Sequence, residues 1–245
     1  MRIPYINEPG TPLSSLPWGR RIRVPFVREL RRGQRQFRRF PPDSFHSILD
    51  IGACEGEFTD LARAYFQSET HWLVEADPEL AKKLEVKYRG IPGCEVIQAA
   101  ITDHTGEATL RVNEHRPSSS VLPIGVRTGE VFGKSMREVR EVNVPALTLD
   151  ELFAEQKIEA VDLMKVDIQG AEKLMIRGGV KALTKVRTIY IEALFEECYQ
   201  GCALFGELDP MLRQQGFKLR DLEDFRRGAD GSLAYGNAIY FRPGK

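Results

Sequence analysis

Residues 47–77 contain a strand, a glycine turn and a helix in close succession. Ser47–Ile51 is a short apolar run typical of a buried strand, and residues 57–67 carry apolar side chains at helical spacing. Gly52 and Gly56, which lie between them, adopt backbone conformations that other residues rarely reach, so the chain can turn sharply from strand into helix. This order predicts the first strand and helix of an open α/β sheet.

The turn at residues 50–56 would lie where open α/β sheets bind ligands, at the carboxyl end of a strand and the N-terminus of a helix. The next apolar run ends in Glu75, and an acidic residue about 20 positions after such a turn accepts hydrogen bonds from ribose hydroxyls. The turn lacks the full dinucleotide fingerprint, and Asp50 and Glu55 suit a ligand with an ammonium and a sulfonium better than a pyrophosphate. We therefore expect S-adenosylmethionine rather than NAD, although glycines also close ordinary strand-to-helix turns.

The composition is that of an ordinary globular protein, with 42% hydrophobic and 29% charged residues. No apolar run approaches the roughly 20 residues of a membrane-spanning helix, and the arginine-rich start lacks the apolar stretch of a secretory signal, so we expect a cytoplasmic protein. The four cysteines and four histidines show no paired spacing of metal ligands. This predicts reduced thiols and no metal site.

Charge is unevenly distributed along the chain, although the net charge is zero. Residues 1–40 hold ten Arg, no Lys and two acidic residues, which makes this segment +8 and the remainder −8. We predict an N-terminal extension over residues 1–43, irregular at first and then with one apolar helical stripe. Its arginines could form a solvated helix face, bind an anionic substrate or contact nucleic acid. Its apolar stripe is expected to pack either on the domain or on a second copy of the chain in a homodimer.

Residues 44–245 are predicted to form one α/β domain, because strands and helices alternate from Ser47 onward. The pattern predicts a helix over Pro78–Tyr88, a third strand over residues 95–101, a polar lid at residues 115–132, an edge strand over residues 142–147 and a C-terminal antiparallel hairpin. In the stretch at residues 161–172, alternation in a central strand brings Lys165 and Asp167 to one face at the carboxyl end of that strand. Both charges would border the cofactor crevice.

In this order the motifs resemble the FkbM-type methyltransferases, which are class I enzymes that use S-adenosylmethionine. The similarity covers about residues 47–242 and rests on residues 50–53 with Gly56, 75–78, 147–150, 165–172 and 191–192. It implies a Rossmann-like, seven-stranded, mostly parallel sheet with helices on both faces and one antiparallel C-terminal strand. It also implies methylation of a hydroxyl on a sugar, polyketide or other secondary metabolite.

The resemblance places the cofactor on the glycine turn and the adenosine hydroxyls on Glu75. The predicted cofactor residues are Asp50, Gly52, Ala53, Cys54, Gly56, Phe58, Thr59, Glu75, Ala76, Asp77, Ala100, Ile101 and Asp167. Two residues depart from the family pattern: Cys54 stands where Asn is usual, and Asn237 stands where many members have Asp.

Methyl transfer to an alcohol needs a group that orients the acceptor oxygen and receives its proton. We predict Asp167 for this role, with Lys165 as its charge partner and Glu192 as a second carboxylate in the crevice. The lysine favours an ionised Asp167 and burial favours a neutral one. Alternatively, Asp167 and Glu172 only fix the loop after the strand, or Asp167 and Glu192 share a divalent cation.

The acceptor contacts are predicted from loop position alone. His115, Ser119 and Tyr199 lie in loops expected near the crevice and are candidate contacts for a hydroxyl-bearing small molecule. Two other functions compete: an RNA methyltransferase whose arginine arm grips phosphates, and a cofactor-binding scaffold without catalysis. No base-methylation motif or RNA-binding module is recognisable, which disfavours nucleic acid, and the intact acidic residues of the crevice disfavour a scaffold.

Overall fold

The computed structural model describes residues 37–40, 45–126, 128–129 and 137–244. Most of the predicted arginine-rich extension and part of the predicted lid lie outside these ranges. None of the helices within them combines the length and the apolar composition that crossing a membrane requires.

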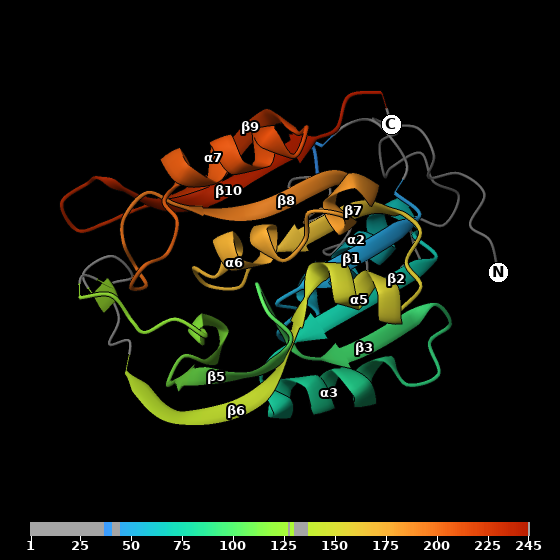
Figure 1. Ribbon diagram of the computed structural model, residues 1–245, viewed down its shortest axis with the longest axis horizontal. Helices are drawn as coiled ribbons and strands as arrows, with labels where there is room; N and C mark the ends of the chain where they lie inside the picture. The colour runs from blue at the N-terminus through green and yellow to red at the C-terminus, as the bar shows by residue number, and fades with distance from the viewer. Residues whose placement is uncertain (1–36, 41–44, 127, 130–136, 245) are drawn as a thin grey trace, which may run out of the picture.

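Seven strands form one sheet in the order β3-β2-β1-β7-β8-β10-β9 (Figure 1). Their bounds are β1 Ser47–Ile51, β2 Thr70–Glu75, β3 Cys94–Gln98, β7 Val161–Val166, β8 Val186–Leu194, β9 Lys218–Arg227 and β10 Leu233–Phe241. The first five in spatial order are parallel, and β10 runs antiparallel between β8 and β9. The predicted Rossmann-like sheet with its antiparallel C-terminal hairpin is therefore confirmed.

Helices cover both faces of this sheet. They are α2 Glu57–Phe66, α3 Pro78–Tyr88, α5 Leu149–Glu155, α6 Glu172–Arg177 and α7 Phe205–Gln214, with two short 3-10 helices, η2 Arg116–Ser118 and η3 Ala182–Lys185. In Figure 1, α5, α6 and α7 lie on the near face, where they pack on strand residues such as Leu49 and Met164. The alternate residues Ile48 and Leu163 face α2 on the other side. Burial on both faces explains why most residues of the central strands are apolar.

Residues 37–40, which lie inside the predicted extension, pack against the face that α2 covers. Phe37 and Phe40 are 3% and 4% exposed and contact aromatic rings of α2 and of Tyr190 on β8. Arg39 forms an ion pair of 3.0 Å with Asp221 on β9. These residues are therefore part of the packed core.

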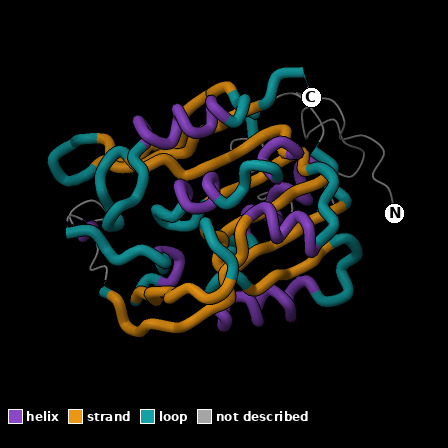
Figure 2. The backbone as a smooth tube through the Cα atoms, in the orientation of Figure 1, coloured by secondary structure: helices purple, strands orange, loops and turns teal. Residues whose placement is uncertain are grey.

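The prediction of one strand over residues 95–101 is wrong. The chain forms β3, and after Ala99 it forms β4, Ala100–Thr102, in a second sheet with β5, Gly106–Asn113, and β6, Glu138–Thr148. Figure 2 shows its two long strands at the lower left. The switch occurs because β2 ends at Glu75, which pairs with Gln98, so no β2 backbone remains for the following residues to pair with.

The prediction that residues 142–147 form an edge strand is also wrong, because β6 lies in the middle of the second sheet. However, β4 pairs with β6 only at Ala146, Leu147 and Thr148. Pro145 has no N–H to donate and lies just before this paired region, where β5 is the strand paired with it. Pro145 is therefore tolerated in a central strand, because it lies at a position where β4 does not pair with β6.

Candidate cofactor and acceptor site

A cavity of about 520 Å³ lies at the carboxyl ends of β1, β2 and β7. Its volume is in the range of roughly 300–1,000 Å³ that is typical of small-ligand pockets. The strand order reverses between β1 and β7, and in open α/β sheets such a switch point is where ligands bind. The cavity therefore lies where the glycine turn predicted it.

The two glycines of the turn are required by close contacts. Gly52 has a φ of 76°, and a Cβ at this position would lie 1.9 Å from the carbonyl oxygen of Asp167. Gly56 has a φ of 77°, and its Cβ would lie 2.5 Å from the hydroxyl of Tyr88. Gly52 lines the cavity together with Ala53 and Cys54, whereas Gly56 lies behind the turn at the start of α2.

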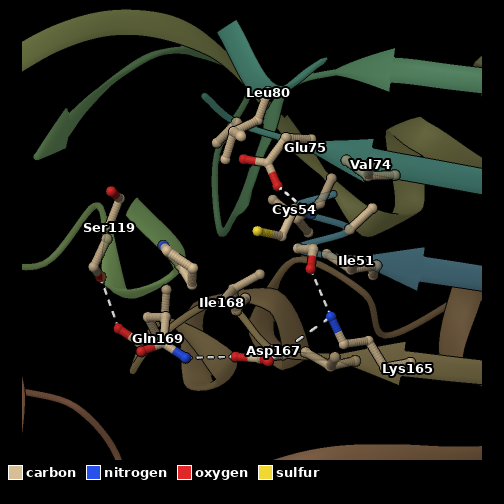
Figure 3. Close-up of a pocket in the computed structure, with 18 of the residues that line it drawn as sticks. Ile51, Cys54, Val74, Glu75, Leu80, Ser119, Lys165, Asp167, Ile168 and Gln169 are labelled. Carbon is tan, nitrogen blue, oxygen red and sulfur yellow. Dashed lines mark hydrogen bonds and ion pairs between the residues drawn. The ribbon is translucent and has the colours of Figure 1, made fainter. Parts of the chain in front are cut away.

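Glu75 reaches the cavity from the end of β2 (Figure 3). Two backbone N–H groups hold its carboxylate. Its Oε2 accepts a hydrogen bond of 2.7 Å from the N–H of Cys54, and its Oε1 accepts one of 2.8 Å from the N–H of Asp77. Burial raises the pKa of Glu75, and these two hydrogen bonds oppose that rise. Each carboxylate oxygen keeps a further lone pair, so the side chain can accept the hydroxyls of a ribose.

Lys165 connects the turn after β1 to β7. Its Nζ donates to the carbonyl of Gly52 at 2.6 Å and lies 3.2 Å from Oδ1 of Asp50 and 3.9 Å from Oδ2 of Asp167. Burial lowers the pKa of Lys165, but the two carboxylates more than offset this and raise it. Asp50 is fully buried and accepts a 2.7 Å hydrogen bond from the hydroxyl of Thr59, so both residues support the turn from beneath. The nearest carboxylate to Lys165 is thus Asp50 rather than Asp167.

Asp167 and Glu192 lie at different depths and are bridged by Gln169, a residue that our sequence analysis did not assign to the site. The side chain of Asp167 is 41% exposed and lines the cavity, whereas Glu192 is 9% exposed. The Gln169 Nε2 donates to Oδ1 of Asp167 at 2.5 Å and to Oε2 of Glu192 at 3.1 Å. Burial and the neighbouring carboxylates of Asp167 and Glu172 raise the pKa of Glu192 well above its ordinary value. An accessible carboxylate therefore lies in front of a buried one.

The wall beside Glu75 is largely apolar. Ala76, Ala100 and Ile101, which are three of the predicted cofactor residues, line it, and Leu80 adds to it. Asp77 lies outside the cavity surface, caps α3 and forms an ion pair of 2.9 Å with Arg116 from the loop after β5. This pair fixes a loop that forms one wall of the cavity.

The three predicted acceptor contacts have different positions. Ser119 lines the cavity. His115 is exposed and is not part of the cavity surface. Tyr199 is fully buried, and its hydroxyl lies 2.6 Å from Oε1 of Gln169 and 3.0 Å from the carbonyl of Ser118.

Several residues on the cavity surface were missing from the sequence-based prediction. They include Glu57, Leu80, Arg116, Gln169, Tyr190 and Asp224. Tyr190 lies two positions before Glu192 on β8, so strand alternation could have placed it, and its ring stacks on that of Phe58 at 5.8 Å. Asp224 has a φ of 52° where the pairing of β9 with β10 is irregular, and no sequence signal predicts such a feature.

The chemistry of this surface fits S-adenosylmethionine. The acidic residues are Glu55, Glu57, Glu75, Asp167 and Asp224, and the basic ones are Lys83, Arg116 and Lys165. Each basic side chain already forms an ion pair, with Glu55, Asp77 and Asp50 respectively. The surface is therefore net acidic and favours a ligand with positive charge, while Glu75 and the apolar wall suit a ribose and a flat ring.

A family model described as the methyltransferase FkbM domain matches residues 50–219 of this chain. The match spans the glycine turn, Glu75 and the whole of the stretch at residues 165–172. It therefore covers the elements that form most of the cavity.

Two curated relatives are similar in sequence. The 2-O-methyltransferase NoeI of Sinorhizobium fredii is 29% identical over 198 residues, which cover 78% of this chain and 79% of the relative. Methyltransferase 1 of Beauveria bassiana is 26% identical over 150 residues, which cover 57% and 59% of the two chains. Among solved structures, the magnesium protoporphyrin IX methyltransferase of Synechocystis, with bound SAM, is 9% identical, covers 92% of this chain and 87% of its own, and has a TM-score of 0.47.

Proposed function

The chain belongs to the FkbM methyltransferase domain family and is an S-adenosylmethionine-dependent methyltransferase, and from this premise we propose that it methylates a hydroxyl oxygen of a small molecule. The proposed acceptors are sugars, glycoconjugates and secondary metabolites. The relative NoeI, named as a 2-O-methyltransferase, supports oxygen as the acceptor atom.

The observation that carries this proposal is the position of Asp167. Its carboxylate is accessible at the end of β7, beside the glycine turn, and one of its oxygens is held by Gln169. A hydroxyl loses its proton when it is methylated, and a carboxylate within hydrogen-bonding reach is suited to orient that hydroxyl and to receive the proton. In this proposal Oδ2 of Asp167 has that role.

The other residues of the cavity hold the reactants. When bound, S-adenosylmethionine supplies an electrophilic methyl group. Glu75 accepts the ribose hydroxyls, the backbone of residues 52–54 forms the adjoining wall, and the apolar wall receives the ring. Lys165 fixes the turn relative to Asp167, so that the acceptor oxygen is aligned by groups on neighbouring strands.

The test combines cofactor binding with an acceptor screen. Calorimetry with S-adenosylhomocysteine measures the cofactor site, and transfer of a labelled methyl group is measured on a panel of methyl glycosides, phenols, amines, carboxylic acids and RNA. We expect transfer to hydroxyl compounds, with an ether linkage in the product. Transfer confined to amines, carboxylates or RNA would refute the proposal.

Asp167→Asn tests the role of the carboxylate. We expect its turnover to fall by roughly 10²–10⁴-fold, the usual contribution of a general base, with affinity for S-adenosylhomocysteine within about threefold of wild type. Asp103→Asn is the matched control, because Asp103 has a similar exposure of 37% and lies outside the cavity surface. An Asp167→Asn enzyme that turns over at the wild-type rate would contradict the assignment.

A further inference from the structure

The side chain of Gln169 is folded back towards the end of β7 by an unusual backbone. Gln169 has a φ of 55° and Gly170 one of 95°, both in the left-handed region. The side chain of Gln169 is therefore directed at Asp167, two residues earlier, and reaches the cavity surface (Figure 3). Its backbone carbonyl accepts a 2.7 Å hydrogen bond from the hydroxyl of Ser120, which fixes this turn to the loop after β5.

Every polar atom of the Gln169 carboxamide has a partner. Its Nε2 donates to Asp167 and to Glu192, and its Oε1 accepts from the hydroxyl of Tyr199 at 2.6 Å. Rotation of the amide by half a turn would place Oε1 against the carboxylate of Asp167, which lacks a hydrogen to donate when ionised. The hydroxyl of Tyr199 adds to this preference because it donates to the amide oxygen.

Tyr199 is itself held rigidly. It is fully buried, and a Cβ added to Gly170 would lie 3.0 Å from Cβ and Cδ2 of the Tyr199 side chain. The glycine therefore allows the Tyr199 side chain to pack directly on the turn that carries Gln169. Tyr199 cannot contact an acceptor from this position, so its hydroxyl is available to fix the amide.

This arrangement leaves one oxygen of Asp167 for chemistry. Gln169 occupies Oδ1 at 2.5 Å, whereas Oδ2 has its nearest cation, Nζ of Lys165, at 3.9 Å. Building on the proposed role of Asp167, we propose that Gln169 is a positioning residue for the methyl transfer, locked in orientation by Tyr199. The Gln169 amide fixes the Asp167 side chain so that Oδ2 remains directed at the acceptor hydroxyl, and Tyr199 acts through Gln169 without contacting either substrate.

The kinetic test uses Gln169→Met, which keeps the length of the side chain and removes both donors, and Tyr199→Phe, which removes one hydroxyl. We expect kcat to fall about 100-fold in Gln169→Met, the typical effect of a misplaced catalytic group, and about tenfold in Tyr199→Phe, equivalent to one hydrogen bond. The acceptor KM and the Kd for S-adenosylhomocysteine should stay within about threefold. Tyr240→Phe is the control, because Tyr240 is equally buried and its hydroxyl binds a carboxylate, Asp209, away from the cavity.

A second readout needs no acceptor. In ¹⁵N-labelled protein, the side-chain amide of Gln169, identified by its loss in Gln169→Met, should exchange its hydrogens at least tenfold more slowly than exposed glutamine amides. Tyr199→Phe should remove this protection, and Tyr240→Phe should leave it intact.

If the Gln169 amide hydrogens of wild type exchange as fast as exposed ones, or if their slow exchange is unchanged in Tyr199→Phe, then Tyr199 does not fix the orientation of the amide. Unchanged kcat in Gln169→Met, or a parallel loss of cofactor affinity, would overturn the positioning role. If wild type methylates none of the hydroxyl compounds, the proposed function fails and the positioning role fails with it, whereas the amide exchange still decides whether the lock exists.

Discussion

Lys165→Met tests how much the buried ion pair beneath the glycine turn stabilises the fold. The change removes an ammonium whose side chain is 11% exposed and which lies 3.2 Å from the fully buried carboxylate of Asp50. Thr59 would then be the remaining side-chain partner of Asp50, through one hydrogen bond of 2.7 Å. The carbonyl of Gly52 would also lose the 2.6 Å hydrogen bond that it accepts from Lys165.

The expected loss of stability follows from the burial of Asp50. Removing one partner of a buried pair leaves an uncompensated charge and costs about 3–5 kcal/mol. For a protein of this size, each kcal/mol lowers Tm by roughly 2–4 °C, so we expect Lys165→Met to lower Tm by about 6–20 °C. Asp50→Asn combined with Lys165→Met should recover at least about 2 kcal/mol, because a buried neutral amide costs less than a buried unpaired carboxylate.

The assay is urea unfolding at pH 7 of wild type, both single variants and the double variant. Lys173→Met is the control, because Lys173 is 27% exposed and lies 3.8 Å from the exposed Glu207, a surface pair worth about 0–1 kcal/mol. The reasoning is refuted if Lys165→Met loses less than about 1 kcal/mol. It is equally refuted if the double variant is less stable than Lys165→Met, because the charge of Asp50 would then not be the cause.

Three further predictions concern the glycine turn, Glu75 in the cavity and the buried Glu172. Gly52→Ala should lower the free energy of unfolding in urea by at least about 2 kcal/mol, because its Cβ would lie 1.9 Å from the carbonyl oxygen of Asp167. The same variant should lose most of its affinity for S-adenosylhomocysteine. Gly90→Ala is the control: Gly90 has a similar φ of 75° but no atom within 4 Å, so the loss should be only about 1–2 kcal/mol. Glu75→Gln should bind S-adenosylhomocysteine at least about tenfold more weakly by calorimetry, because its NH₂ group would face a buried backbone N–H; unchanged affinity would argue against the ribose contact. Burial raises the pKa of Glu172 to about 7, so the stability from its protonated form is present below pH 4.5 and is lost as pH rises to about 7. Unfolding curves should therefore show wild type losing about 3 kcal/mol relative to Glu172→Gln over this interval, and parallel pH profiles would contradict the pKa.

Strong local signals made much of the fold predictable. Helix α3 begins at Pro78 and ends at Tyr88 as predicted, because Asp77 caps it and proline suits its first turn. The turn at residues 50–56 is similarly indicated by its own glycines. These signals lie in a few adjacent residues, so they can be read without knowledge of the rest of the chain.

The remaining features depend on contacts between distant segments. Nothing in the run from Glu95 to Ile101 marks the change of sheet at Ala99, because residues with a high strand propensity lie on both sides of it. Tyr199 was assigned to the acceptor from its loop position, but its burial on Gly170 is visible only in three dimensions. The hydrogen bond from Gln169 to Glu192 likewise joins the turn after β7 to strand β8, and the distance between them is set by the pairing of β7 with β8.

The packing of Phe37 and Phe40 determines where a shortened version of this enzyme could begin. A protein that starts at residue 44 would leave uncovered the aromatic surface formed by Phe58 on α2 and Tyr190 on β8, which also line the cavity. It would also lack the guanidinium of Arg39 that neutralises the carboxylate of Asp221. We therefore expect a protein that begins just after Phe40 to aggregate and to bind acceptors poorly.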